Sequence, residues 1–362
     1  MQKVEKYLLD YCIVALGKVL DAVKNTSVSS LIEVAQSGKQ DSLFIDVLPE
    51  NILNMSLIED YDNNIVLVTE EKGGFNFEEI SRAELVVFSD PTDRSKPIKN
   101  FIQKNIDSNR INHSSLFREL IDSDRIIEEW SEFATFHPRL SGASCSLTVV
   151  KRGTILFSLI LNYITQEIFV ACSEFTGYAH ASKVGQSPAS HEFKSWTPIK
   201  FMDAMRDDYT SYVSFLAKDY REYLINTNLL DDSFKPLDSD PGGPVRILFL
   251  SDLNDRPTGF VFANGEKIGE WLGWLAYCKY SNKNLVAYSV YPGTTFAKDN
   301  IIMTPSPPYS ILELRGRDLF LNYDKLRYFE NPSRYREMIV IAHKDNHIIR
   351  GRVESKKSRL LF

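Results

Sequence analysis

The order of apolar and amphipathic segments predicts a layered α+β fold. Residues 2–37 carry helical periodicity, whereas residues 65–68 and 85–88 are short apolar runs typical of buried strands. Between residues 142 and 182, β-rich runs are separated by Lys-Arg-Gly and Asn-Tyr turns, which indicates an antiparallel meander. Helices come first, strands follow and the second half is mixed, an order that disfavours a βαβ Rossmann chain.

The individual elements follow from local signals. A break at Asn-Thr-Ser-Val-Ser-Ser divides residues 2–37 into two predicted helices, with Ser29 or Ser30 as the cap of the second. Further predicted helices are residues 98–136, 202–224 and 269–281, and further predicted strands are residues 245–251, 259–263 and 337–344. The stretch PLDSDPGGP, residues 236–244, predicts a linker because it is rich in proline and glycine.

Composition limits the possible functions. The chain has 362 residues, which is long enough for two domains. Its residues are 43% hydrophobic and 25% charged, a composition typical of globular proteins with ordinary cores. Its net charge of -6 argues against a general nucleic-acid or anionic-membrane binder. Four cysteines without a CxxC pair favour reduced, buried thiols. No stretch approaches the roughly 20 apolar residues of a membrane span, so we expect a cytoplasmic protein.

Acidic residues follow two of the predicted strands. Glu70 and Glu71 come after residues 65–68, and Asp90 and Asp93 come after residues 85–88. If the two strands are neighbours in one sheet, these acids converge on one point. Hard divalent cations such as Mg²⁺ take oxygen ligands of this kind, so the pattern predicts a metal site.

The residues around Asp93 fit a site for a phosphate group. Thr92 lies between the two aspartates and could offer its main-chain carbonyl to a metal ion. Arg94 and Ser95 come directly after, where the N–H groups of a helix start can hold phosphate oxygens. Two divalent ions a few Å apart can clamp a phosphoryl group and orient a water. Motifs of serine hydrolases, P-loop proteins, dinucleotide-binding proteins and HExxH metalloproteases do not occur in the sequence.

These motifs resemble those of a known superfamily. TEEKGG followed by VFSDPTDRS, with Asn100-Phe101 shortly after, is similar to the paired motifs of the inositol monophosphatase and fructose-1,6-bisphosphatase superfamily. The resemblance covers residues 5–100 and 142–182 well and 240–290 loosely, with 102–141 as a helical insertion. It implies a layered αβαβα sandwich and a Mg²⁺-dependent, lithium-sensitive phosphatase that uses two or three ions, with Mn²⁺ as a substitute.

The resemblance also implies roles for particular residues. Glu70, Asp90, Asp93, the Thr92 carbonyl and an acid at the start of a later helix would bind the metal. Glu270 is the expected late acid, and Glu266 is the weaker choice. Glu70 and Ser95 would activate the attacking water, while Arg94 and Ser95 would bind phosphate. Asp46 and Glu71 are weaker candidates for support of this site.

One residue departs from the family pattern. Arg94 stands where the family has glycine, which allows close backbone approach to the phosphate. Arg94 could clamp the phosphate through its guanidinium group. Alternatively, it could neutralise the acids and leave a phosphatase-like binding or regulatory protein without activity. The residues leave both alternatives open.

The resulting expectation is a cytoplasmic phosphomonoesterase that hydrolyses a small phosphorylated metabolite, such as an inositol or sugar phosphate, by metal-activated water. A 3′-phosphonucleotide or a sugar bisphosphate is an alternative substrate. Residues 1–185 would form a metal-binding α+β domain, and residues 186–362 a second α/β domain that completes the active site. We expect no nucleic-acid or membrane partner, and the resemblance leaves a homodimer open.

Overall fold

The structure is a computed structural model of the chain. It describes residues 3–35, 42–59, 65–69, 71, 76–184, 193–201, 211–213, 231, 233, 235–236, 243–254, 258–263, 268–281, 284–290, 312–315, 318–323, 338–354 and 359–360. Most of the predicted helix 202–224 lies outside these residues. Residues 211–213, which belong to that stretch, form a strand, so the helix prediction is wrong there.

The first sheet contains the two acid-bearing strands. Its order is β1-β2-β3-β4-β5-β6-β7, and β13 also pairs with β4 and with β12. β1 and β2 run parallel with Val68 opposite Phe88, and the antiparallel meander β3 to β6 follows as predicted. The bounds are β1 Ile65–Thr69, β2 Leu85–Asp93, β3 Ser144–Lys151, β4 Thr154–Asn162, β5 Glu167–Cys172, β6 Thr176–His180, β7 Thr197–Pro198, β12 Leu312–Arg315 and β13 Asp318–Leu321.

The second sheet belongs to the later part of the chain. Its order is β15-β11-β14-β10-β8-β9, with β14 antiparallel to both β10 and β11. The bounds are β8 Ser211–Val213, β9 Lys235–Pro236, β10 Phe260–Ala263, β11 Leu285–Val290, β14 Met338–His343 and β15 Arg359–Leu360. Because β7 and β13 come from beyond residue 185 and yet pair into the first sheet, the domain boundary near that residue stays a prediction.

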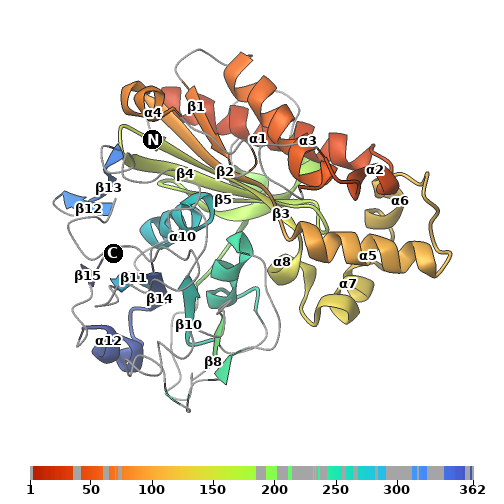
Figure 1. The fold of residues 1–362 in the computed structure, drawn as a ribbon. Helices are drawn as coiled ribbons and strands as arrows, with labels where there is room; N and C mark the ends of the chain where they lie inside the picture. Colours follow the sequence, from red (N-terminus) through yellow and green to blue (C-terminus); the bar gives the residue numbers. More distant parts are fainter. Residues whose placement is uncertain are drawn as a thin grey trace, which may run out of the picture.

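Helices complete the layers. α1 and α3 cover one face of the first sheet, and α10 lies between the two sheets (Figure 1). One core lies between α1, α3 and the first sheet, and a second surrounds α10. The molecule therefore has the predicted layered α+β fold. The helical bounds are α1 Lys3–Lys24, α2 Val28–Leu31, α3 Phe44–Asn54, a π-helix Met55–Glu59, α4 Phe77–Arg82, α5 Ser95–Asp107, α6 Phe117–Ile121, α7 Ile126–Ala134, α8 Pro138–Ser141, α10 Ile268–Tyr280, α12 His347–Glu354 and the 3₁₀ segments Ala181–Lys183, Phe193–Ser195 and Pro244–Leu250.

Two local predictions are wrong. The second helix is capped by Ser27, whose side chain accepts the N–H of Ser30, because α2 begins at Val28. The predicted strand 245–251 is a 3₁₀ helix, Pro244–Leu250, in which every residue is buried. A short apolar run buried on all sides has no strand periodicity that would separate it from a helix.

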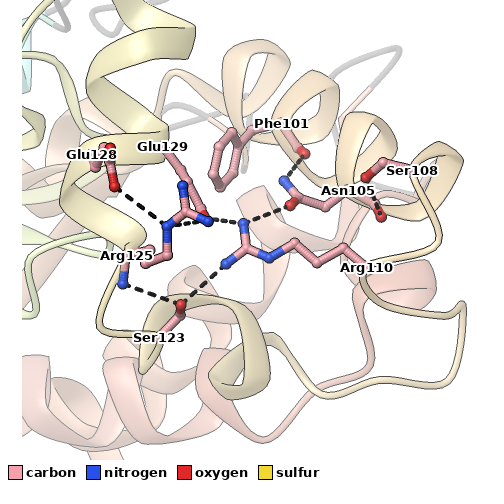
Figure 2. A network of polar contacts seen from close by, with 8 residues as sticks. All are labelled: Phe101, Asn105, Ser108, Arg110, Ser123, Arg125, Glu128 and Glu129. Carbon is pink, nitrogen blue, oxygen red and sulfur yellow. Dashed lines mark hydrogen bonds and ion pairs between the residues drawn. The ribbon is translucent and has the colours of Figure 1, made fainter.

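Residues 102–141 contain the second half of α5 and the short helices α6, α7 and α8. Figure 2 shows the Arg110 guanidinium between Asn105 of α5, Ser123 and Glu129 of α7. Arg125 reaches Glu128 and Glu129 with 3.3 and 3.9 Å between ion-pair atoms. Partly exposed pairs of this kind contribute at most about 1 kcal/mol each. The Arg110 contacts connect α7 to α5, the helix that begins at Ser95, whereas the Arg125 pairs lie within the start of α7.

Candidate metal and phosphate site

The aspartates lie within a strand rather than beyond its end. β2 continues to Asp93, and β3 pairs with it as far as Asp90 opposite Ser146 and Asp93 opposite Ser144. The register shifts between the two aspartates, so Pro91 and Thr92 face one residue of β3. Pro91 lacks an N–H for the ladder, and such a bulge is where a sheet accommodates proline. The prediction that the strand ends at residue 88 is therefore wrong.

Three carboxylates meet at this bulge. Asp90 and Asp93 come from β2, and Glu270 comes from the first turn of α10. One carboxylate oxygen from each lies within 4.8 Å of the others. Asp90 and Glu270 are both 2% exposed. The structure thus brings together acids that are 180 residues apart in the sequence, from 90 to 270.

The cluster carries more negative charge than its surroundings can solvate. Burial, together with the charges of Asp93, Asp46 and Glu71, raises the pKa of Asp90 to about 8, although a hydrogen bond with Glu270 opposes the shift. A buried carboxylate without a compensating cation takes up a proton instead. Oxygen donors of this number and spacing fit a hard divalent cation. The residues present therefore fit Mg²⁺ or Mn²⁺.

The weaker candidates lie around the cluster. Asp46 is buried in the first turn of α3, where its Oδ2 accepts the Leu43 N–H at 2.8 Å. Glu71 is buried and accepts a hydrogen bond from Ser42. Both are close enough to Asp90 to raise its pKa, so they belong to the electrostatic environment of the site.

Thr92 has a fixed conformation in the bulge. Its N–H donates to Asp90 Oδ1 at 3.2 Å, and its hydroxyl donates to the Ile45 carbonyl at 2.7 Å. These bonds orient the Asp90 carboxylate and connect β2 to the start of α3. They leave the main-chain carbonyl of Thr92 as the group that we predict to bind metal.

Arg94 adopts a left-handed conformation, with φ 68° and ψ 35°. This region favours glycine, which explains why a glycine suits this position, and it costs another residue roughly 1 kcal/mol. Two guanidinium nitrogens, Nε and Nη1, are buried within the protein. Ser95 follows as the first residue of α5, whose 13 residues give its first turn unpaired N–H groups suited to an anion.

Two glycines were not predicted to belong to the site. Gly243 donates its N–H to Asp93 Oδ2 at 2.6 Å, and a Cβ there would lie 2.8 Å from the Glu270 carboxyl carbon. A Cβ on Gly269 would lie 3.0 Å from the Ser89 carbonyl carbon, so this glycine lets α10 approach β2. The sequence predicts a linker over residues 236–244 because of their glycines and prolines, and nothing in that stretch indicates that Gly243 contacts the carboxylates.

Two predicted residues, Glu70 and Glu266, lie outside the described residues. Thr69, which precedes Glu70, is opposite Ser89 in the parallel pair, as the predicted pairing of the strands requires. The roles given to Glu70 and Glu266 stay predictions. Within the part of the chain that the structure describes, no helix is both long and apolar enough to cross a membrane.

The fold and site define a class of protein, a layered α+β protein with a buried carboxylate cluster where its first sheet meets α10. Solved structures of this architecture match the chain over nearly its whole length. CysQ from Bacteroides thetaiotaomicron, a bacterial member of the inositol monophosphatase family, is similar with TM-score 0.53 and 10% identity, covering 95% of this chain and 98% of its own. The suppressor protein SuhB from Bartonella henselae is similar with TM-score 0.52 and 11% identity, covering 98% and 99%.

A staphylococcal IMPase-II with inositol monophosphate bound is also similar, with TM-score 0.51 and 11% identity, covering 96% of this chain and 94% of its own. The chain therefore has the fold of the inositol monophosphatase family, and the resemblance is confirmed at the level of the fold. No family model and no curated protein matches the sequence.

Proposed function

We propose that the protein is a metal-dependent phosphomonoesterase that acts on a small phosphate ester. The observation that carries this proposal is the buried convergence of Asp90, Asp93 and Glu270 from the two halves of the chain. Such a cluster stabilises the fold poorly by itself because its charges repel one another. A divalent cation removes that repulsion, and a phosphate ester supplies further oxygen ligands.

We assign separate roles to the metal-binding and the phosphate-binding residues. Asp90, Asp93, Glu270, Glu70 and the Thr92 carbonyl would hold the ions. A divalent cation held there would supply polarisation of the phosphoryl oxygens and a lower pKa for the attacking water.

At the start of α5, Ser95 and the first main-chain N–H groups bind phosphate oxygens, and Arg94 adds its guanidinium group. The Glu70 carboxylate would accept the proton of the water while the Ser95 hydroxyl hydrogen bonds to that water; the ester P–O bond breaks as the new P–O bond forms, and the leaving alcohol takes up a proton from solvent. No side chain is assigned as a covalent nucleophile.

The substrate class is small phosphorylated metabolites. One protein of this fold, the staphylococcal IMPase-II, has inositol monophosphate bound. Inositol and sugar monophosphates are the first candidates, followed by sugar bisphosphates and 3′-phosphonucleotides. An inactive binding or regulatory protein is the alternative. The observation that favours it is that two guanidinium nitrogens of Arg94, the residue directly after Asp93, are buried.

Phosphate release tests the proposal. Wild-type protein with Mg²⁺ is expected to release phosphate from at least one of these esters, and EDTA is expected to stop the release. No release with Mg²⁺ or Mn²⁺ from any of them would contradict the phosphatase. In the same assay, Arg94→Gly is expected to raise KM because the phosphate loses a cationic partner. Turnover that appears only in Arg94→Gly would instead support the inactive alternative.

Arg152→Gly is the matched control for Arg94→Gly. Arg152 is exposed in the turn between β3 and β4 and also has a positive φ, of 47°. Both substitutions relieve a left-handed arginine, which favours the folded state by about 0.5–1 kcal/mol; in Arg94→Gly the loss of the buried guanidinium group opposes this gain. Only Arg94→Gly is expected to change KM, which separates the effect on phosphate binding from the effect on the backbone.

A further inference from the structure

A tyrosine from the turn after β4 holds the bulge between Asp90 and Asp93 in place. Tyr163 lies in the corner after β4 and is fully buried. Its hydroxyl donates to the Pro91 carbonyl at 2.8 Å and lies 3.4 Å from Thr92 Oγ1. Tyr163 therefore contacts the two residues that separate Asp90 from Asp93.

Those two residues need such an anchor. The ladder between β2 and β3 is interrupted from Asp90 to Asp93, and Pro91 has no N–H to contribute. Thr92 is held from the other side by the Ile45 carbonyl, 2.7 Å from its hydroxyl. Tyr163 and Ile45 thus replace the missing ladder bonds, so the bulge is fixed by β4 and α3 together.

We infer that Tyr163 is a positioning residue for the metal site, an inference that rests on the proposed function. Its hydroxyl fixes the Pro91 peptide, and through it the separation and direction of the Asp90 and Asp93 carboxylates. Thr92 follows Pro91 directly, so a fixed Pro91 peptide also restricts the direction of the Thr92 carbonyl. The hydroxyl acts through these groups and does not itself bind the ion.

A loosened bulge should change ion selectivity as well as affinity. Mg²⁺ requires near-ideal octahedral geometry, whereas Ca²⁺ tolerates flexible sites. Removal of the Tyr163 hydroxyl is therefore expected to weaken Mg²⁺ binding more than Ca²⁺ binding. A residue that only stabilises the fold would not alter this ratio at temperatures well below unfolding.

The test is calorimetric titration of Mg²⁺ and Ca²⁺ into Tyr163→Phe. Loss of groups that orient metal ligands typically costs 10–100-fold in affinity, so Mg²⁺ binding is expected to weaken by about 10-fold or more. Tyr277→Phe is the matched control. Tyr277 is also fully buried, and its hydroxyl has no hydrogen-bond partner among the described residues. It is expected to leave both affinities unchanged.

Thr92→Val provides a second route if Tyr163→Phe folds poorly. It removes the hydroxyl that reaches Ile45 and is expected to lower the Mg²⁺ to Ca²⁺ affinity ratio in the same direction. Tyr163→Phe with wild-type affinity and ratio would overturn the inference. If the wild-type protein binds neither Mg²⁺ nor Ca²⁺, both the metal site and the inference about Tyr163 are overturned. Because turnover is not the readout, a wild-type protein that binds Mg²⁺ but hydrolyses nothing would overturn only the phosphatase.

Discussion

Replacement of Asp90 by asparagine is expected to weaken Mg²⁺ binding and metal-dependent turnover by more than about 100-fold. Loss of a group that only orients a metal ligand already lowers metal affinity or activity by about 10–100-fold, and Asp90 is proposed as a ligand itself. The same substitution is expected to make the metal-free protein more stable near neutral pH. Folding near neutral pH requires Asp90 to take up a proton that the unfolded chain has released, and asparagine, which cannot ionise, avoids that cost. Opposite effects on metal binding and on metal-free stability distinguish a ligand from an ordinary structural acid.

The pH dependence of stability has a definite sign. The pKa of Asp90 is raised from 3.8 to about 8 in the folded protein, so the folded state keeps a proton that the unfolded chain releases. Stability of the metal-free protein is therefore expected to fall as pH rises from about 4 to about 8, by at most about 1.4 kcal/mol per pH unit. Mg²⁺ is expected to stabilise the protein more at pH 8 than at pH 5.

Thermal unfolding at several pH values, with EDTA or with Mg²⁺, measures this dependence. Asp90→Asn should flatten the slope of the metal-free protein and abolish the effect of Mg²⁺. Asp107→Asn, which alters an exposed acid at the end of α5, should leave both unchanged. If Asp90→Asn keeps the wild-type slope and the wild-type response to Mg²⁺, the carboxylate cluster is not the origin of either.

Replacement of Gly243 by alanine is the second change with a large expected effect. The new methyl group would lie 2.8 Å from both the Glu270 carboxyl carbon and its Oε1. The Glu270 carboxylate is the end of a side chain and can move away at a modest cost, about 1–3 kcal/mol including the shift of the backbone. That movement takes a metal ligand out of place, so Mg²⁺ affinity is expected to fall at least about 10-fold.

Gly17→Ala is the control for this substitution. Gly17 lies in α1 with open space around the position of a Cβ, so alanine there is expected to stabilise the helix by up to about 1 kcal/mol and leave Mg²⁺ binding unchanged. The readouts are calorimetric Mg²⁺ affinity and thermal unfolding. Wild-type affinity in Gly243→Ala would show that the contact between Gly243 and Glu270 does not set the geometry of the site.

The parts of the fold that sequence predicts best are those with a clear period and a clear stop. The parallel neighbours β1 and β2 follow from two apolar runs that each precede acids, and the meander follows from its turns. The extension of β2 to Asp93 could not be predicted, because proline argues against a strand unless a bulge is known to be present. The 3₁₀ helix Pro244–Leu250 was missed because its residues are buried on every side.

The same limits apply to the site. Asp90 and Asp93 could be predicted because they follow an apolar strand, and Glu270 because the family resemblance implies an acid at the start of a later helix; the structure brings these three carboxylates together. Gly243 and Tyr163 could not be predicted, since a glycine in a polar stretch predicts a turn and a tyrosine in a corner predicts packing. Their contributions depend on contacts with Asp93 and Pro91, which are far from them in the sequence.

A crystal soaked in Mn²⁺ tests most directly whether Asp90, Asp93 and Glu270 bind a divalent cation. We predict an anomalous peak between these carboxylates, at the roughly 2.0–2.6 Å separations from oxygen ligands that are typical of hard divalent cations. A crystal without such a peak, in which the Arg94 guanidinium lies between the three acids, would contradict it.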